Sequence, residues 1–304
     1  MYLFNPDLKV LYFRFCYSSM NTLFVSKPTV KITASGLSFK INEDSYIIQD
    51  LDRISNIMIV AKSGYISIYA LRLFALKKIT LTLHNLNGSI IYHFIPDSSN
   101  SNIGNRILQY DLYLHNRKKI ADKIVKAKKE KYQEMLKKYK LPLLTSDLEN
   151  VFSNEYFARF QELITSYGYA YSGRKGFYLV SNQKATNFIN ALLNFYYGLI
   201  EHRLLTQIYY YGFDYSISFL HEPNYNKLSL TYDLIEFLRA DIDNTVIELA
   251  RDKKIKQTDF ELTKNGYYMI REDKISKYLK PITTVENKTK EVLNEFTDIL
   301  TSNQ

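Results

Sequence analysis

Short stretches of alternating apolar and polar residues fill the chain from Thr22 to Phe94. A period of two places every second side chain on the same face, which is typical of half-buried β-strands. Turn-forming residues such as Pro28 and Gly36 separate these stretches. One stretch, SIYALRLFAL, has helical spacing instead. The predicted strands are TLFVS, VKITASGLSFKI, YIIQDL, ISNIMIVAK, ITLTLHN and GSIIYHFI.

The pattern changes near residue 100. The segment PDSSNSNIGN, residues 96–105, is polar and rich in turn formers, and helical spacing follows it almost to the end of the chain. Helices are expected at about 105–139, 146–166, 185–211 and 229–251, with a hairpin at 265–270 and a last amphipathic helix. The pattern predicts an α+β protein, with an N-terminal β-sandwich-like domain (20–95), a linker (96–105) and a larger all-α domain (106–304).

Composition narrows the class of protein. The 304 residues contain no run of eighteen or more apolar residues, which argues against a membrane-spanning protein. The apolar opening, residues 1–19, has no basic start and is interrupted by charges, so we interpret it as an extension and not as a secretion signal. Cys16 is the only cysteine, which excludes an intramolecular disulfide and a cysteine-based zinc site. We therefore expect a cytoplasmic protein.

The charge is uneven along the chain. The net charge is +9, and the segment from Arg117 to Lys140 holds eleven lysines and arginines against three acids. Apolar residues recur in it at helical spacing, so it predicts an amphipathic helix with a basic outer face. Such a face attracts phosphates through Coulomb interactions. A solvated linker helix has the same pattern, so both interpretations stay open.

One histidine and two carboxylates are candidate metal ligands. His221 ends the apolar run SISFL, and Asp233 and Glu236 follow three residues apart in a predicted helix. Imidazole and carboxylate ligands suit Mn²⁺ or Mg²⁺. The alternative is an ordinary loop beside a solvated helix face, because acids three residues apart are common on such faces.

A third ligand must come from elsewhere, and Glu149 is the best candidate. It opens a predicted helix, but Ser146 three residues before it also fits a capping box, in which Glu149 accepts a hydrogen bond from the first amide. The local sequence leaves both roles open.

Two segments, GFDYSISFLHEP and LSLTYDLIEFLR, resemble the signature of the CRISPR-associated adaptation endonuclease/integrase family, the larger of the two proteins shared by most spacer-acquisition systems. In that family Gly-x-Asp precedes an aliphatic pair and a histidine, and Ser-Leu precedes an Asp-x-x-acid helix that ends in Arg or Lys. This chain has the corresponding residues in order: Gly212, Asp214, Phe219, Leu220, His221, Ser229, Leu230, Asp233, Glu236 and Arg239.

Other segments extend the resemblance over roughly residues 20–280. MNTLFVSKPTVKITASGLSFKI resembles the usual start of the family, which would make Met20 the ordinary first residue. NFINALLNFYYGLIEHRLL and DLENVFSNEYFARF resemble two of its helices, and the second aligns Glu149. The chain departs from the family where glycine and two alanines are usual, at Asn150, Phe152 and Ser153, and where a glycine is usual, at Asn226.

The resemblance implies a metal-dependent DNA endonuclease and integrase that inserts spacers into a CRISPR array by 3′-hydroxyl attack on a phosphodiester. It implies that Glu149, His221 and Glu236 hold Mn²⁺ or Mg²⁺ and that Asp233 orients His221 or a metal-bound water. Arg174, Lys175 and Lys227 are expected to contact DNA phosphates, although Arg174 and Lys175 also fit ordinary loop charges.

The implied partners are branched double-stranded DNA with free 3′-hydroxyl ends, a second copy of the chain bound through the β domain, and a small ferredoxin-like adaptation protein. No membrane partner is expected. A non-catalytic DNA-binding scaffold is the alternative function.

Overall fold

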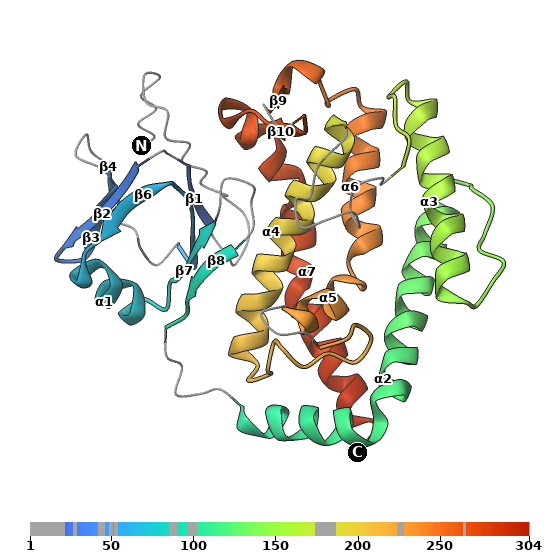
Figure 1. Ribbon diagram of the computed structural model, residues 1–304, viewed down its shortest axis with the longest axis horizontal. Coiled ribbons are helices and arrows are strands. Elements are labelled where there is room, and N and C mark those ends of the chain that lie inside the picture. Colours follow the sequence, from blue (N-terminus) through green and yellow to red (C-terminus); the bar gives the residue numbers. More distant parts are fainter. Residues whose placement is uncertain are drawn as a thin grey trace. The chain divides into compact units, whose positions relative to one another are not determined.

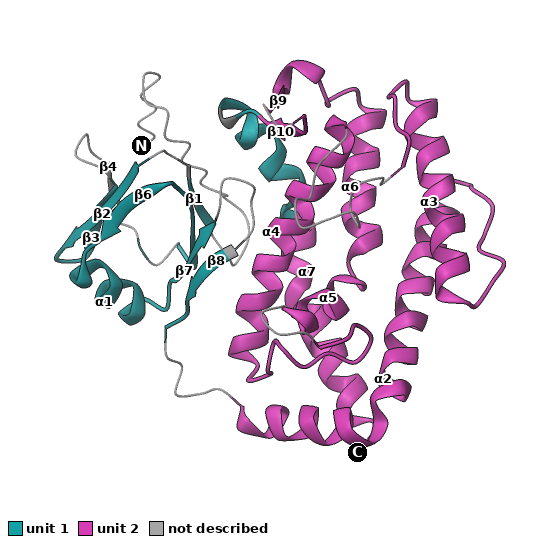
Figure 2. Ribbon diagram, in the orientation of Figure 1, with its two compact units in different colours: residues 1–99, 271–283 teal, residues 100–270, 284–304 magenta. Residues whose placement is uncertain are grey.

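A computed structural model describes residues 22–26, 29–41, 46–48, 51, 54–84, 90–96, 102–173, 187–223, 228–263 and 266–303. The chain divides into two compact units (Figure 2): unit 1 comprises residues 1–99 and 271–283, and unit 2 comprises residues 100–270 and 284–304. The predicted extension 1–19 and the predicted DNA contacts Arg174, Lys175 and Lys227 lie outside the described residues.

Unit 1 holds two sheets, each with four strands among the described residues, in the orders β1-β5-β7-β8 and β4-β3-β2-β6. In the first sheet β1, β5 and β7 are parallel and β8 is antiparallel; in the second, β6 is parallel to β2 and the other pairs are antiparallel. The strands are β1 (Thr22–Ser26), β2 (Thr29–Ser35), β3 (Ser38–Ile41), β4 (Tyr46–Ile48), β5 (Asn56–Val60), β6 (Ser63–Ile66), β7 (Thr80–His84) and β8 (Ile90–Phe94).

Both sheets and helix α1 (Ile68–Leu76) share one hydrophobic core. Alternation in β2 buries Val30 and Ile32, and α1 contributes Phe74, whose ring meets that of Phe39 edge-on at 5.1 Å. The sequence pattern did not predict β6, a short strand in which Gly64 (φ +144°) lies against the carbonyl of Val30. A side chain at this position would clash with that backbone, so glycine is needed there.

Unit 2 is mainly helical (Figure 1). Helix α2 bends at Asn116, whose backbone is not helical (φ −131°, ψ 15°), so its two halves run in different directions. The α+β fold class predicted from the sequence is confirmed by this arrangement. The elements are α2 (Ile103–Lys138), α3 (Glu149–Ser166), α4 (Phe188–Tyr210), α5 (Ser229–Ile235), α6 (Arg239–Arg251), β9 (Phe260–Leu262), β10 (Tyr268–Ile270) and α7 (Ile275–Thr301).

One predicted helix was wrong in its extent. The single helix expected at 229–251 is interrupted at residues 236–238, where three successive backbone amides bond to the carbonyl three residues earlier and tighten the chain into a turn. At the C-terminus, α7 begins at Ile275 and continues through Pro281, so it belongs to both units. Among the described residues no helix is long and apolar enough to cross a membrane.

Candidate active site

The loop that carries His221 is held by one buried carboxylate. Asp233, on α5, is fully buried and accepts hydrogen bonds from the backbone amides of Phe219, Leu220 and His221 at 2.6, 3.0 and 3.0 Å. Its Oδ1 also lies 2.8 Å from Nδ1 of His221. Because a carboxylate only accepts hydrogen bonds, Nδ1 carries the proton, and a neutral ring keeps its lone pair on Nε2. The His221 side chain is 40% exposed.

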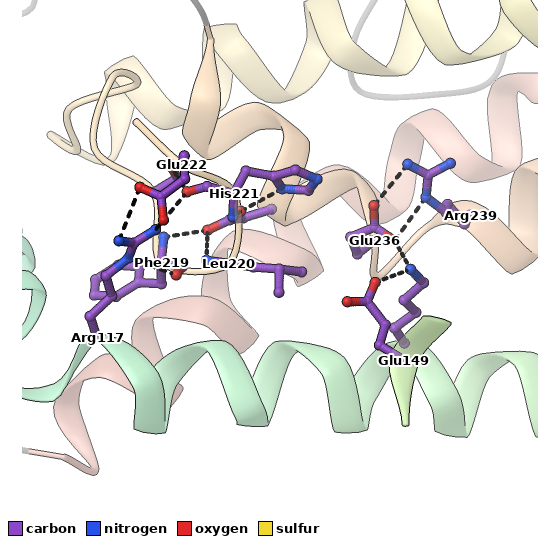
Figure 3. A network of polar contacts seen from close by, with 11 residues as sticks. Arg117, Glu149, Phe219, Leu220, His221, Glu222, Glu236 and Arg239 are labelled. Carbon is purple, nitrogen blue, oxygen red and sulfur yellow. Dashed lines mark hydrogen bonds and ion pairs between the residues drawn. The ribbon is translucent and has the colours of Figure 1, made fainter. Parts of the chain in front are cut away.

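Helix α2 also holds this loop, through the backbone carbonyls of the loop. Just after the bend of α2, Arg117 donates from Nε to the carbonyl of Phe219 at 3.0 Å and from Nη2 to the carbonyl of His221 at 3.2 Å. The same guanidinium pairs with Glu222 (Figure 3). Gly212 opens the preceding turn with φ +80°, and a Cβ there would lie 2.4 Å from the carbonyl oxygen of Asn102. The loop is therefore fixed at both its amides and its carbonyls.

Glu236 lies in the turn between α5 and α6 and is 2% exposed, which rules out the solvated-face alternative for it and for Asp233. Arg239 binds it with two contacts, Nε to Oε2 and Nη2 to Oε1, both at 2.8 Å. Burial raises the pKa of Glu236, but the cations Arg239 and Lys128 outweigh burial and hold the pKa at about 2. Glu236 is therefore ionised at neutral pH.

Lys128 joins Glu149 to Glu236. Its Nζ lies 2.7 Å from Oε1 of Glu149 and 2.9 Å from Oε2 of Glu236. In Figure 3 the two carboxylates, from α3 and from the α5–α6 turn, point toward one another. The structure thus brings two of the three predicted metal ligands onto one cationic group, although they are distant in sequence.

The capping role considered for Glu149 is wrong. Helix α3 begins at Glu149 itself, with Leu148 as its N-cap and no side-chain hydrogen bond to that cap. The Ser146 hydroxyl accepts a hydrogen bond from the amide of Leu148 at 3.0 Å instead. Glu149 is 39% exposed and its carboxylate faces Lys128, so it is available to a ligand.

A buried carboxylate behind the cluster fixes the helices that carry it. Asp243 on α6 accepts from the hydroxyls of Tyr156 on α3 and Tyr197 on α4, at 3.0 and 2.9 Å. The guanidinium of Arg239 lies 5.2 Å from the centre of the Tyr197 ring. Because Tyr156 follows Glu149 by two helical turns, this network sets the position of α3 relative to the α5–α6 turn.

The donor set suits a divalent cation in its chemistry. The carboxylates of Glu149 and Glu236 already share one cationic group, the Lys128 ammonium. Nδ1 of His221 is bound to the carboxylate of Asp233, and a contact of this kind usually orients a histidine whose other nitrogen binds a metal. Within the part of the chain that the structure describes, however, no hydrogen bond or ion pair joins His221 to Glu149 or Glu236. In that same part no group of three or more His, Cys, Asp or Glu side chains is arranged to hold a metal.

The sequence pattern missed two residues of this site. Lys128 is 6% exposed although it lies in the basic segment. Lys128 lies four residues after Ile124 and four before Tyr132, and both of these residues are fully buried. This spacing places Lys128 on the buried face of α2. That spacing could have identified Lys128. Arg117 had no comparable signal, because its partners are backbone carbonyls of a distant loop.

Tyr232 lies between His221 and Glu201, a glutamate whose pKa is raised. Its ring lies edge-on to the His221 ring at 6.0 Å, and its hydroxyl hydrogen-bonds with Glu201 on α4. Burial raises the pKa of Glu201 to about 7, and the hydrogen bond from Tyr232 opposes this only in part. Glu201 on α4 is therefore a group that titrates near neutral pH, next to Tyr232 of α5.

We expect Glu201→Gln to stabilise the protein, and increasingly so as the pH rises. A glutamate carboxyl in water has a pKa of 4.5, and burial raises the pKa of Glu201 in the folded protein to about 7. Between these two values the unfolded chain is ionised while the folded protein binds a proton. The free energy of unfolding of the wild type therefore falls as the pH rises from 4.5 to about 7. The free energy of unfolding of the Glu201→Gln variant does not fall in this way, because glutamine does not ionise.

A shift of one pKa unit corresponds to about 1.4 kcal/mol, and partial exposure of Glu201 reduces the effect. We therefore expect Glu201→Gln to raise the free energy of unfolding by about 1–3 kcal/mol at pH 8. Urea unfolding between pH 5 and pH 8 measures it, with the exposed Glu291→Gln as control. A gain that does not grow with pH contradicts the assignment.

The family model for CRISPR associated protein Cas1 matches residues 23–145 and 143–283 of the chain. A curated relative, CRISPR-associated endonuclease Cas1 1 of Thermodesulfovibrio yellowstonii, is 35% identical over 72 residues, which cover 24% of this chain and 23% of the relative. The chain thus matches about a quarter of the length of that relative.

Solved structures share the fold over nearly the whole chain. A casposase bound to an integration product superposes with a TM-score of 0.78 at 22% identity, covering 94% of this chain and 92% of the casposase chain. A chain of a Cas6-RT-Cas1–Cas2 complex gives a TM-score of 0.69 at 16% identity, covering 98% of this chain and 36% of that one.

Proposed function

Because the chain belongs to the Cas1 family of CRISPR-associated proteins, we propose that it is a divalent-cation-dependent DNA endonuclease and integrase. In this role it inserts spacers into a CRISPR array by attack of a DNA 3′-hydroxyl on a phosphodiester. The observation that carries the proposal is the pairing of Glu149 and Glu236 on one cationic group beside the fixed His221 loop. The shared fold of a casposase bound to an integration product supports strand transfer as the reaction.

Glu149, Glu236 and Nε2 of His221 would hold Mn²⁺ or Mg²⁺. When bound, such a cation polarises a phosphoryl oxygen and stabilises the charge that develops on the attacking or leaving oxygen. Asp233 orients the imidazole, and Arg239 keeps the Glu236 carboxylate in one position. The attacking group belongs to the DNA, so no side chain is needed as a covalent nucleophile.

The bend of α2 offers a surface for the DNA backbone. A shallow hollow there is lined by four lysines and one acid, together with His115 and Asn116; the charged residues are Lys118, Lys119, Asp122, Lys123 and Lys126. Lys118, Lys119 and Lys126 are exposed, so their ammonium groups can reach phosphates. Arg174, Lys175 and Lys227 remain proposed phosphate contacts.

Replacing Lys118, Lys119 and Lys126 together with alanine should weaken DNA binding and reduce its salt dependence. Each phosphate contact contributes about 0.9 to the slope of log affinity against log salt concentration, so the slope should fall by about 2 to 3. Fluorescence anisotropy with a labelled branched duplex measures this. The matched control removes three exposed charges at the end of α6, Arg251, Lys254 and Lys256; an equal loss in both variants would show that net charge alone is responsible.

The partners proposed for this activity are branched duplex DNA, a second copy of the chain bound through unit 1, and the small ferredoxin-like adaptation protein, in the cytoplasm. A Cas1–Cas2 complex among the structures of the same fold supports the last protein partner. A non-catalytic DNA-binding scaffold is the second candidate, because Asn150, Phe152 and Ser153 stand in helix α3, which carries Glu149, where the family usually has a glycine and two alanines.

Strand transfer separates the two candidates. Purified protein is incubated with branched DNA carrying a labelled 3′-hydroxyl end, in Mn²⁺, Mg²⁺ or EDTA, and the joined product is resolved on a denaturing gel. The integrase forms product with a cation and none in EDTA, and His221→Ala abolishes the product. Salt-sensitive binding with no product under any condition would leave the scaffold role.

A further inference from the structure

Lys128 is a buried lysine whose ammonium contacts both glutamates of the proposed cation site. Its side chain is 7% exposed, and the rings of Tyr132 and Phe152 each lie 5.9 Å from Nζ. Lysine is rarely buried to this degree unless its charge is paired. Here the contacts at 2.7 and 2.9 Å to Glu149 and Glu236 supply the pairing.

The charges of this cluster balance without any further ion. Two carboxylates, Glu149 and Glu236, face two cations, Lys128 and Arg239. Arg239 binds Glu236 through both of its oxygens and its side chain is only 12% exposed, so it is fixed in place. Lys128 is the cation that spans both carboxylates, on a flexible stem of four carbons.

A divalent cation and the ammonium cannot occupy this position together. A cation would sit about 2 Å from the carboxylate oxygens it binds, and the ammonium already lies within 2.9 Å of one oxygen of each glutamate. Like charges at such a separation repel strongly in a partly buried site. Glu149 is partly exposed, so the cluster opens to solvent on that side and the ammonium can leave toward water or a phosphate oxygen.

We propose that Lys128 is an internal competitor of the divalent cation. Its ammonium holds Glu149 and Glu236 together, and a cation binds to these carboxylates by displacing it. Lys128 therefore lowers the affinity of the free protein for the cation. This inference rests on the proposed cation site, because it assigns the same two carboxylates to both occupants.

Calorimetric titration with Mn²⁺ tests the competition. Lys128→Met keeps an unbranched apolar side chain of similar length and removes the charge, so it should bind Mn²⁺ at least tenfold more tightly than the wild type. Lys129→Met is the matched control, since Lys129 is the next residue on α2 and pairs with the exposed Asp147; its affinity should stay within twofold of the wild type. Equal or weaker binding by Lys128→Met overturns the proposal.

An NMR measurement on the wild-type protein tests the competition even if Lys128→Met does not fold. Lysine labelled with ¹³C at Cε gives a signal for Lys128, which a Lys128→Arg variant assigns. On titration with Mg²⁺ this signal should shift in step with saturation of the site. A Lys128 signal that stays unchanged at saturating Mg²⁺ overturns the competition.

Glu149→Gln distinguishes this inference from the proposed function. If this variant binds Mn²⁺ as the wild type does, the cation site itself is wrong, and the competition falls with it. If it loses Mn²⁺ binding while Lys128→Met gains none, only the role of Lys128 is wrong.

Discussion

Glu149→Gln should lower the rate of strand transfer at least about a hundredfold while the protein stays folded and still binds DNA. The substitution keeps the size and shape of the side chain but removes the charge that faces Glu236 across the Lys128 ammonium. The side chain is 39% exposed, so the cost to stability is small compared with the loss at a fully buried ion pair.

Rates are measured as single-turnover strand transfer in Mn²⁺, alongside circular dichroism and DNA-binding affinity. The control is Glu155→Gln, which alters a glutamate of the same helix that bonds to Thr145 and Arg159. The control should retain the wild-type rate within a few fold. A Glu149→Gln protein that keeps more than half of the wild-type rate would exclude Glu149 from catalysis.

Asp233→Ala should reduce the free energy of unfolding by about 3–5 kcal/mol. The substitution leaves the amides of the His221 loop without their acceptor, and Nδ1 of His221 as well. The carboxylate is fully buried, so water cannot replace it without opening the loop. Strand transfer should fall with it, because the imidazole loses its fixed orientation.

Urea unfolding at pH 7 measures the stability loss. Asp241→Ala is the control, because Asp241 makes a partly exposed ion pair with Lys288 and the substitution should cost less than Asp233→Ala, about 1 kcal/mol. Asp233→Asn keeps one acceptor oxygen and should lie between alanine and the wild type. A loss below about 1 kcal/mol for Asp233→Ala would show that the loop does not depend on this carboxylate.

Most β-strands and most helices followed from local pattern because each buries one regular face, whereas β6 did not. Val30 and Ile32 alternate along β2, and Phe74 lies on the buried side of α1, so a period of two or of 3.6 was enough to place them. The turn at residues 236–238 could not be predicted in this way. It contains no glycine or proline, and its geometry accompanies the buried contacts of Glu236 with Arg239 and Lys128.

The candidate site was predictable only in part. The order of residues around His221 and Asp233 identified the loop and its helix, and the alignment of Glu149 pointed to a third element. The pairing of Glu149 with Glu236 through Lys128 depends on how α2, α3 and the α5–α6 turn pack, which no local pattern contains. The contribution of His221 to a shared cation site stays a prediction.

A crystal grown with Mn²⁺ tests the central claim most directly, because anomalous scattering locates the ion without reference to activity. We predict one peak at about 2 Å from carboxylate oxygens of Glu149 and Glu236 and from Nε2 of His221, with the Lys128 ammonium moved away from both glutamates. A protein saturated with Mn²⁺ that shows no peak at these side chains, or a peak bound elsewhere, would contradict it.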